Sequence, residues 1–405
     1  LGLLASTLLA APSTFAEDRS AFTWKDGDRV VLIGDTLIER DQTHGYLETL
    51  ITANNPDKTI TFRNLGWSAD SVLGLSRAGF GKPEEGFQQL KEHVLGLKPT
   101  VLIVGYGMSA SFEGEAGLPA FKSGLKRLLD TLAETRARLI LLSPIGHEDH
   151  GRPLPDPRAH NEALALYRDA VREIAQERDA WFVDLYEPTL SATDYGIDPL
   201  TDNGIHPTAY GYWYLASVID LELRGQKDDP GWVVTVDVAS GKVAAPDGVT
   251  IADVKTGGGK VSMAVTDVAL PIPPAPPGAP DAVWIGSKRE IKVQGLDPGD
   301  YTLTIDGQTI ATVDELTWFR RVRLDRGPEF DQVEALRRAI NAKNALYFHR
   351  WRPQNETYLF GFRKHEQGNN AREIPLFDPL VEAKEKEIAR LKVPVRRRYE
   401  VFPAR

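Results

Sequence analysis

A regular alternation over residues 29 to about 225 constrains the fold of this chain more than any other feature. Short, β-branched apolar runs alternate with longer segments in which apolar residues recur at helical spacing. The runs expected to be strands are 30–33, 59–62, 101–104, 139–142 and 181–183. The segments expected to be helices are 87–97, 118–134, 158–178 and 208–223. Such alternation predicts an α/β fold with a doubly wound parallel sheet, covered by helices on both faces.

The pattern changes after residues 226–230. Shorter alternating runs follow, separated by turn signals such as Asp297-Pro-Gly-Asp300, and they predict a small β domain or insertion over 226–327. The segment 328–405 is expected to hold a helix near 329–347 and then a polar, aromatic stretch that packs back on the first domain.

The apolar run at residues 1–11, followed by Thr14-Phe15-Ala16, is typical of the hydrophobic region and cleavage site of a secretory signal. Residues 1–16 are therefore expected to be a signal peptide whose start is missing, and 17–225 the first mature domain. We expect export to the periplasm or the extracellular space. A buried core helix is the alternative for residues 1–11.

Composition excludes several function classes. The net charge of −9 argues against a general nucleic-acid binder, since phosphate contacts require clustered Lys and Arg. The basic cluster Arg396-Arg397-Arg398 is interpreted as a solvated tail. Without cysteine, thiolate zinc sites and cysteine nucleophiles are impossible. We expect no cofactor, no bound metal and no membrane span in the mature chain; the sequence does not indicate the oligomeric state.

Polar residues follow the expected strands where these end. Gly34-Asp35-Thr36 comes directly after the first strand, a turn lies at 64–71, another at 105–111, and His206 stands just before the helix at 208–223. In open parallel sheets, ligands bind beyond the carboxyl ends of the strands. These segments are therefore expected to meet at one edge of the sheet.

In order and spacing, these four segments resemble the sequence blocks of the SGNH (GDSL-like) hydrolase family. The resemblance covers roughly residues 29–225 and implies a three-layer, flavodoxin-like domain. It also implies a serine nucleophile after Gly-Asp, a histidine base, and an aspartate three residues before that histidine. By this resemblance Thr36 takes the nucleophile's place and His206 that of the base, whose tautomer a third residue must hold. A backbone-capping hydroxyl is the alternative for Thr36, and a surface or capping imidazole for His206.

The chain departs from the family pattern at four positions. Thr36 replaces serine, and its β-methyl restricts χ1. Ala69 stands where the family has an oxyanion-hole glycine, and Ser109 where it has an asparagine that donates to the oxyanion. Asn203 occupies the position of the acid, with Asp202 one residue earlier. We slightly favour Asp202, brought to His206 by a small shift of the loop; the alternative is an impaired triad.

Other residues are weaker candidates. Trp67, Phe112 and Trp213 lie beside the catalytic turns and are expected to stack on a sugar face, with core packing as the alternative for each. His147-Glu148-Asp149-His150 could ligate a divalent metal, but a solvated loop that lines the substrate entrance is favoured.

The C-terminal polar segment could complete the site. Asn355-Glu356 and His365-Glu366-Gln367 lie in a stretch too polar for a core, and one hypothesis has it fold across the mouth of the cleft. An ordinary polar surface wrap is the alternative.

Together these features favour an exported esterase, a hydrolase acting on the ester bond of a small-molecule or carbohydrate substrate, with an acetyl group as the most plausible acyl group. The alternative is a hydrolase fold that has lost catalysis and serves as a glycan-binding or scaffolding module.

Overall fold

The structure is a computed structural model that describes residues 21–79, 81–197, 199–226, 231–280 and 288–404. The expected signal segment at 1–16 lies outside the described residues. No helix in the described part of the chain is long and apolar enough to cross a membrane.

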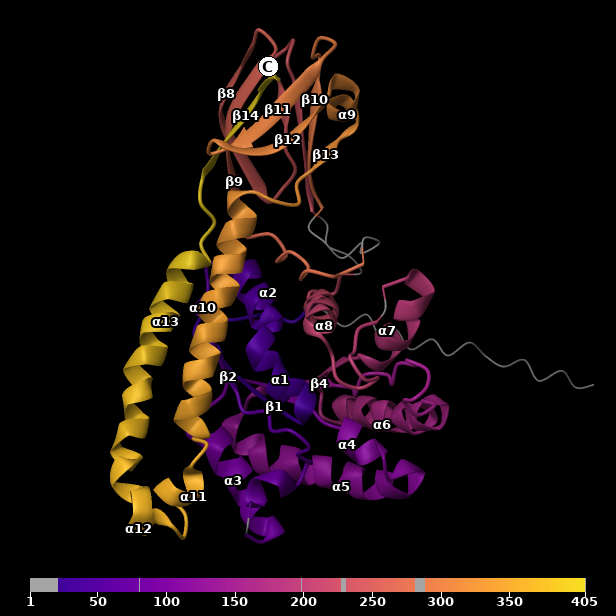
Figure 1. Ribbon diagram of the computed structural model, residues 1–405, viewed down its shortest axis with the longest axis vertical. Helices are drawn as coiled ribbons and strands as arrows, with labels where there is room; N and C mark the ends of the chain where they lie inside the picture. Colours follow the sequence, from indigo (N-terminus) through magenta and orange to yellow (C-terminus); the bar gives the residue numbers. More distant parts are fainter. Residues whose placement is uncertain (1–20, 80, 198, 227–230, 281–287, 405) are drawn as a thin grey trace, which may run out of the picture.

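The first domain contains the expected parallel sheet. Its strands are β1 (Arg29–Gly34), β2 (Thr61–Asn64), β3 (Val101–Gly105), β4 (Arg138–Leu142) and β5 (Trp181–Val183). They are arranged in the order β2-β1-β3-β4-β5, and every pair is parallel. The doubly wound α/β prediction is therefore confirmed. We call this unit the α/β domain (Figure 1).

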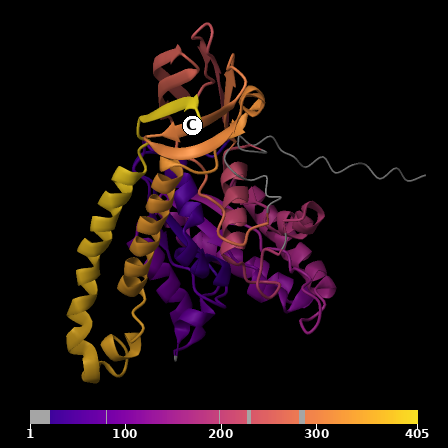
Figure 2. The same ribbon diagram turned by 45° about the horizontal axis from the view of Figure 1, so that its top comes forward.

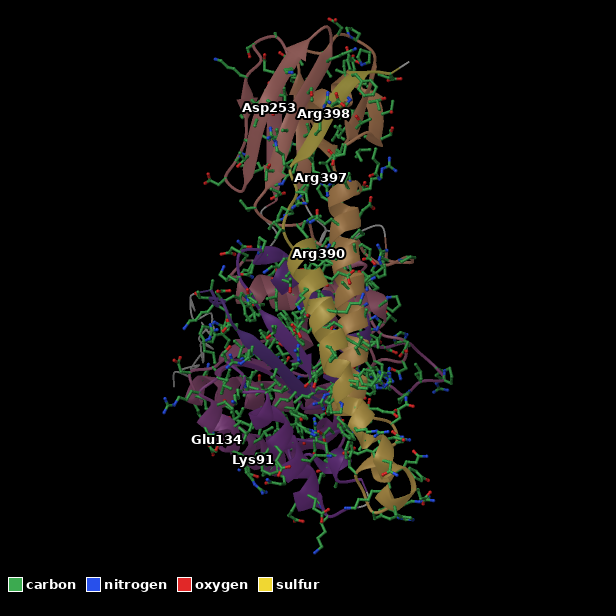
Figure 3. The ribbon with its side chains drawn as sticks, turned by 90° about the vertical axis from the view of Figure 1, so that its left-hand side faces the viewer. Lys91, Glu134, Asp253, Arg390, Arg397 and Arg398 are labelled. Carbon is green, nitrogen blue, oxygen red and sulfur yellow. The ribbon has the colours of Figure 1, made fainter. Side chains whose placement is uncertain are left out.

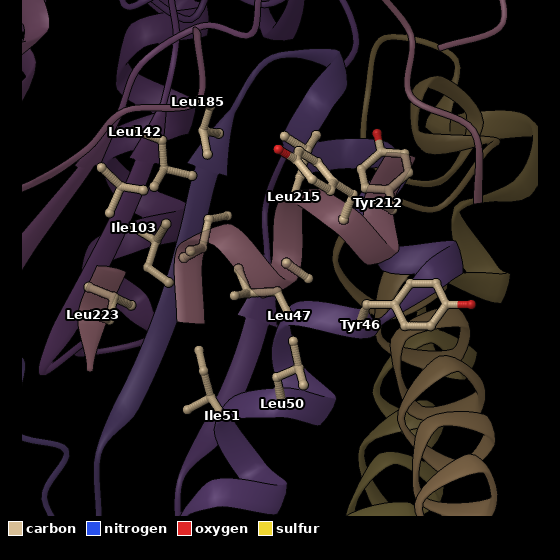
Figure 4. Close-up of a cluster of buried hydrophobic side chains, with 14 of the residues drawn as sticks. Tyr46, Leu47, Leu50, Ile51, Ile103, Leu142, Leu185, Tyr212, Leu215 and Leu223 are labelled. Atoms are coloured by element: carbon tan, nitrogen blue, oxygen red, sulfur yellow. The ribbon is translucent and has the colours of Figure 1, made fainter. Parts of the chain in front are cut away.

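Helices cover both faces of this sheet. Alternate residues of β1 point to opposite sides, so that Val30 and Leu32 join one buried cluster and Val31 and Ile33 join the other. The first cluster, part of which Figure 4 shows, packs against α1 (Thr36–His44), α2 (Tyr46–Asn54) and α8 (Ala209–Leu223). The second packs against α3 (Pro83–Gly96), α5 (Gly114–Leu132) and α6 (Arg158–Glu177). Shorter helices are α4 (Met108–Ser111) and α7 (Tyr186–Ser191).

The second unit is a sandwich of two β-sheets. One sheet has the order β13-β10-β6-β7, and the other has the order β12-β11-β14-β9-β8. The first contains β6 (Trp232–Asp237), β7 (Val243–Ala244), β10 (Arg289–Gln294) and β13 (Val322–Arg323). The second contains β8 (Val249–Gly257), β9 (Lys260–Asp267), β11 (Asp300–Ile305), β12 (Gln308–Asp314) and β14 (Arg397–Pro403). Inward residues of both sheets form one core around Trp318 of α9 (Glu315–Arg320).

A helical hairpin lies along the α/β domain, beneath the sandwich (Figures 1 and 2). It consists of α10 (Pro328–Trp351), α11 (Glu356–Leu359), α12 (Lys364–Gln367), the 3-10 helix η4 (Gly368–Leu376) and α13 (Phe377–Leu391). Helix α10 contacts α1, α2 and β2 of the α/β domain, and α13 packs against α10.

After α13 the chain returns to the sandwich as β14, which pairs with both β9 and β11. The sandwich therefore is not confined to residues 226–327, because a strand from beyond the hairpin lies in the middle of its larger sheet. The interpretation of Arg396-Arg397-Arg398 as a solvated tail is wrong for the same reason. Arg397 and Arg398, which Figure 3 labels, belong to β14. Arg397 pairs with Asp306 at 3.0 Å.

Candidate active site

The Thr36 hydroxyl stands at the carboxyl end of the sheet, on the first residue of α1. Asp35 caps this helix, and one of its carboxylate oxygens accepts the Leu37 N–H at 3.3 Å. The strand can end this close to its neighbour because residue 34 is glycine: a Cβ there would lie 2.3 Å from the Gly105 carbonyl oxygen. Thr36 is thereby fixed at the expected edge of the sheet.

The turn at residues 64–71 is tied to α1 and brings Ala69 to the threonine. The Asn64 amide donates to the Ile38 carbonyl at 2.6 Å, and the Trp67 N–H donates to the Gly34 carbonyl at 3.1 Å. Ala69 adopts a φ of 55°, a left-handed conformation that costs a non-glycine residue about 1–2 kcal/mol. Its backbone N–H donates to Thr36 Oγ1 at 3.1 Å.

The His206 imidazole is held by Asn203. Asn203 Nδ2 lies 2.9 Å from His206 Nδ1, and Asn203 Oδ1 accepts the backbone N–H groups of Ile205 at 3.3 Å and of His206 at 3.0 Å. Asp202, which the sequence slightly favoured, is exposed, and its backbone N–H bonds the His206 carbonyl at 3.0 Å. The loop does not shift as expected, because this backbone pairing directs the Asn203 side chain to the ring.

Thr36 and His206 line one cavity of about 300 Å³. Ala69 and Ser109 also line it, together with Asp35, Leu37, Gly105, Tyr106, Met108, Phe112, Ser143, Pro144, Ile145 and Ile205. Among the described residues, no hydrogen bond joins the Thr36 hydroxyl to the His206 imidazole. Thr36, Ala69, Ser109 and His206 thus share a site in which the Thr36 hydroxyl is turned towards Ala69.

Burial determines the protonation states in this cavity. The Asp35 side chain is buried, and the loss of hydration raises its pKa to about 7, although backbone N–H groups of Leu37 and Ser109 partly oppose this. Its Oδ2 has no hydrogen-bond partner among the described residues. The pKa of His206 is lowered by burial and then by the positive charge of Arg40. His206 is therefore a neutral imidazole near pH 7.

The sequence model of the GDSL-like Lipase/Acylhydrolase family matches residues 32–214. These residues form a GDSL-like lipase/acylhydrolase domain. The resemblance seen in the four sequence segments is thereby confirmed. The match excludes the sandwich and the hairpin, so these two units are additions to the GDSL-like domain.

Solved structures share the fold of this chain. The structure described as BT4096, a gut microbial diltiazem-metabolizing enzyme, is 16% identical with a TM-score of 0.75, and the alignment covers 96% of this chain and 100% of that one. At this identity the likeness establishes the fold, and it extends beyond the GDSL-like domain. No curated protein matches the sequence.

Two smaller structures match half of the chain. LAE5, an alpha/beta hydrolase enzyme from the metagenome of Lake Arreo, Spain, is 20% identical with a TM-score of 0.40 and covers 50% of this chain and 97% of its own. Axe2, an acetylxylan esterase from Geobacillus stearothermophilus, is 18% identical with a TM-score of 0.39 and covers 50% of this chain and 96% of its own.

Of the three aromatic residues predicted to bind substrate, the structure brings Phe112 to the cavity of the GDSL-like domain. Phe112 is 61% exposed and stacks on His160, with ring centroids 4.1 Å apart. Trp67 lies beside the Ala69 turn, but the Arg352 guanidinium covers its ring at 3.4 Å from the centroid. Trp213 is buried in the core, and its Nε1 donates to the Pro273 carbonyl at 2.8 Å. Neither tryptophan lines the cavity.

The loop at residues 147–150 of the GDSL-like domain is hydrogen-bonded to residues 200–204, in the loop that carries His206. The buried Glu148 carboxylate accepts the backbone N–H groups of Leu200 at 2.8 Å and of Thr201 at 2.6 Å, together with the Thr201 hydroxyl. None of its four residues lines the cavity, so the loop is not the substrate entrance that the sequence suggested. It is solvated in part, since Asp149 and His150 are exposed whereas His147 and Glu148 are buried. No cluster of three or more potential metal ligands occurs in the described residues.

The C-terminal segment reaches the GDSL-like domain at another place than expected. His365 is exposed and lies near Glu366, and Asn355 bonds Gln367 at 3.0 Å; none of these residues lines the cavity. Instead, Arg352 Nη1 donates to Glu39 Oε1 at 2.6 Å, and Glu39 in turn bonds Ser68, next to Ala69. The hairpin therefore buttresses the Ala69 turn rather than adding groups to the cavity.

Asp35, which lines the cavity, and His160, which stacks on Phe112 beside it, were not among the predicted site residues. Asp35 was part of the Gly-Asp-hydroxyl junction, and its burial at the strand end was the available signal. His160, which lies under Phe112, comes from the start of α6, where helical periodicity alone marks no function.

Proposed function

We propose that this protein hydrolyses a carboxylic ester, with Thr36 as the nucleophile and His206 as the base. The observation that carries the proposal is that Thr36, Ala69 and His206 all line one cavity at the carboxyl end of β1, with the Ala69 N–H on Thr36 Oγ1. A hydroxyl requires an adjacent base before it attacks an ester, and the oxyanion requires preorganised donors.

The reaction would proceed in two steps. Thr36 Oγ1 attacks the ester carbonyl carbon and gives its proton to His206 Nε2, and the tetrahedral oxyanion lies near the Ala69 N–H. The C–O bond to the alcohol then breaks, and the imidazolium returns the proton to the leaving alcohol. A water molecule then attacks the acyl-threonine and gives a proton to His206. The bond between the acyl carbon and Thr36 Oγ1 breaks, the carboxylic acid leaves, and the imidazolium returns the proton to Oγ1.

The resting position of the hydroxyl favours slow turnover. Thr36 Oγ1 accepts the Ala69 N–H, so the nucleophile is hydrogen-bonded to a donor that the oxyanion would need. The side chain must rotate about χ1 before attack, and a β-branched residue has fewer accessible rotamers than serine.

The walls of the cavity favour a small acyl group on a larger alcohol. Leu37, Met108 and Ile145 supply apolar surface within a volume of about 300 Å³, which suits a short acyl chain such as acetyl. Phe112 at the rim presents an exposed ring, and aromatic faces stack on the C–H surface of sugars. An O-acetylated carbohydrate is the substrate class that fits both features.

Hydrolysis of p-nitrophenyl acetate by the purified protein tests the proposal. We expect a rate above background, loss of at least about 100-fold in kcat with His206→Ala, and a higher kcat with Thr36→Ser. His349→Ala, which changes an exposed histidine of α10 outside the cavity, serves as the matched control and should leave the rate unchanged. Equal rates for the wild type and His206→Ala would refute the esterase assignment.

A second candidate is a glycan-binding module that has lost catalysis. It is favoured by Asn203, an amide where a hydrolase of this type needs a carboxylate beside Nδ1. Binding of an unacetylated oligosaccharide that Phe112→Ala abolishes, in a protein without esterase activity, would favour this candidate.

Export is part of the proposal. It is supported by the apolar run at 1–11 and the small residues that precede Glu17. Recovery of the protein in the periplasmic or culture fraction, with mature protein beginning near residue 17, is the expected result of cell fractionation.

A further inference from the structure

The Asn203 side chain has one orientation that satisfies its neighbours. Its Oδ1 accepts two backbone N–H groups, those of Ile205 and His206. Turning the amide by 180° would place its NH₂ group against both donors, and both hydrogen bonds would be lost. Side-chain oxygens that accept N–H groups two and three residues ahead form a stable local turn. The amide is therefore locked by the backbone of its own loop.

This lock sets the proton on the imidazole. Because Oδ1 is engaged, the group 2.9 Å from His206 Nδ1 is the NH₂ donor, and Nδ1 must accept. A neutral imidazole has one accepting and one donating nitrogen. Its proton then lies on Nε2, the nitrogen left available to the cavity that His206 lines.

A nitrogen that carries a proton cannot accept another from Thr36. We propose that Asn203 is a positioning residue that holds His206 in the Nε2–H tautomer, so that the resting imidazole is a hydrogen-bond donor towards the cavity and not a base. This inference rests on the proposed function, because it identifies what limits that reaction. Attack by Thr36 requires the Nδ1–H tautomer, in which two donors, Nδ1–H and the Asn203 amide, would face each other.

The local environment does not supply a substitute acceptor. The charged groups that act on His206 are Arg40, which disfavours the imidazolium, and the exposed Asp202, which favours it weakly. The imidazolium formed during catalysis thus lacks a carboxylate at Nδ1 among the described residues. Replacement of the triad aspartate by asparagine in a serine protease, which creates the wrong tautomer in the same way, lowers kcat about 10⁴-fold.

Asn203→Asp tests the inference directly. An aspartate keeps one oxygen for the N–H groups of Ile205 and His206 and offers the other to Nδ1–H, which frees the lone pair of Nε2. Nitrogen-15 NMR of uniformly labelled protein near pH 7.5, with His206→Ala to assign the signals, reports which imidazole nitrogen carries the proton. We expect Nε2–H in the wild type and Nδ1–H in Asn203→Asp. Asp202→Asn is the matched spectral control and should leave the tautomer unchanged. Nδ1–H in the wild type would overturn the inference whatever the activity.

Kinetics supply the second readout. We expect Asn203→Asp to raise kcat for p-nitrophenyl acetate by between about 10-fold and 10⁴-fold, and to move the acid limb of the kcat/KM profile to higher pH, since a carboxylate stabilises the imidazolium. An active wild type whose rate and profile are unchanged by Asn203→Asp would overturn the inference. If both proteins are inactive but the tautomer switches, the proposed esterase function fails while the assignment to Asn203 stands.

Discussion

At the scale of single residues, Asp35 shows how the start of α1 combines structural and chemical demands. Its carboxylate caps the helix that carries Thr36, yet it is buried, and its Oδ2 has no partner among the described residues. Burial disfavours the charged form and raises the pKa to about 7. The folded protein therefore retains a proton that the unfolded chain releases near pH 4.

This proton makes stability depend on pH. Between about pH 4 and 7 the unfolded state binds fewer protons at Asp35 than the native state, so the free energy of unfolding falls as pH rises through that window. Asn also caps helices but does not titrate. We expect Asp35→Asn to match the wild type near pH 4 and to gain at most about 4 kcal/mol relative to it near pH 8. Urea denaturation at several pH values measures this, and parallel pH curves for the two proteins would contradict it.

Much of the site could be predicted at this scale, because its segments resemble a known pattern in order and spacing. The structure places four of the predicted residues around one cavity: Thr36, Ala69, Ser109 and His206. The choice between Asp202 and Asn203 could not be made, since it depends on the backbone pairing that turns one side chain inward and the other outward. The burial of Trp213 in the core depends likewise on a contact with distant Pro273.

At the scale of elements, the loop from Leu200 to His206 owes its shape to the loop that precedes α6. Glu148 accepts two backbone N–H groups and a hydroxyl from this loop, while its own N–H donates to the Gly204 carbonyl at 2.9 Å. Glu148 touches no group that reacts, so it acts through the placement of His206.

Glu148→Ala should therefore damage both folding and catalysis. The substitution leaves the backbone N–H groups of Leu200 and Thr201 without an acceptor. An unsatisfied buried donor costs about 1–3 kcal/mol, and we expect the free energy of unfolding to fall by about 3 kcal/mol in total. Because the loop that carries His206 would then move, the base would be misplaced, and we expect kcat to fall by about 100-fold. Glu148→Gln keeps one acceptor and should lose less of both, and Asp149→Ala, a change of an exposed neighbour, serves as the control. A stable Glu148→Ala protein with wild-type kcat would contradict this role.

The sheet strands and the long amphipathic helices could be predicted from periodicity, but α1 and α2 could not. Helix α2 is buried along Tyr46 to Ala53, because α8 covers one side and α10 the other, and a helix without an exposed face shows no apolar stripe. Helix α13 and strand β14 were also missed. Strand β14 lies in a run of arginines, and its pairing with β9 and β11 depends on contacts far away in sequence.

At the scale of the whole molecule, a buried ion pair joins the helical hairpin to the GDSL-like domain. Lys343 Nζ of α10 lies 2.6 Å from Glu48 Oε1 of α2 and also donates to the Phe62 carbonyl at 3.2 Å. Removal of one partner leaves an uncompensated buried charge, which costs about 3–5 kcal/mol, whereas replacement of both by uncharged groups costs far less.

Lys343→Met should accordingly destabilise the protein by about 3–5 kcal/mol, and the double variant with Glu48→Gln should recover most of that loss. Chemical denaturation of the two variants and the wild type measures the difference. Lys386→Met removes one partner of an exposed pair on the neighbouring α13 and should change stability by less than about 1 kcal/mol. Equal effects of Lys343→Met and Lys386→Met would contradict a role of the buried pair in docking the hairpin.

The position of β14 also has a consequence for biosynthesis. This strand pairs on both sides within the larger sheet, yet the ribosome makes it after the complete helical hairpin. Until β14 is made, the edges of β9 and β11 that face each other in the finished sheet lack their partner strand. The GDSL-like domain precedes the sandwich in the chain, so all of its strands have been made by then. Once β14 has inserted, both ends of the hairpin are joined to the sandwich, because α10 follows β13 and α13 precedes β14.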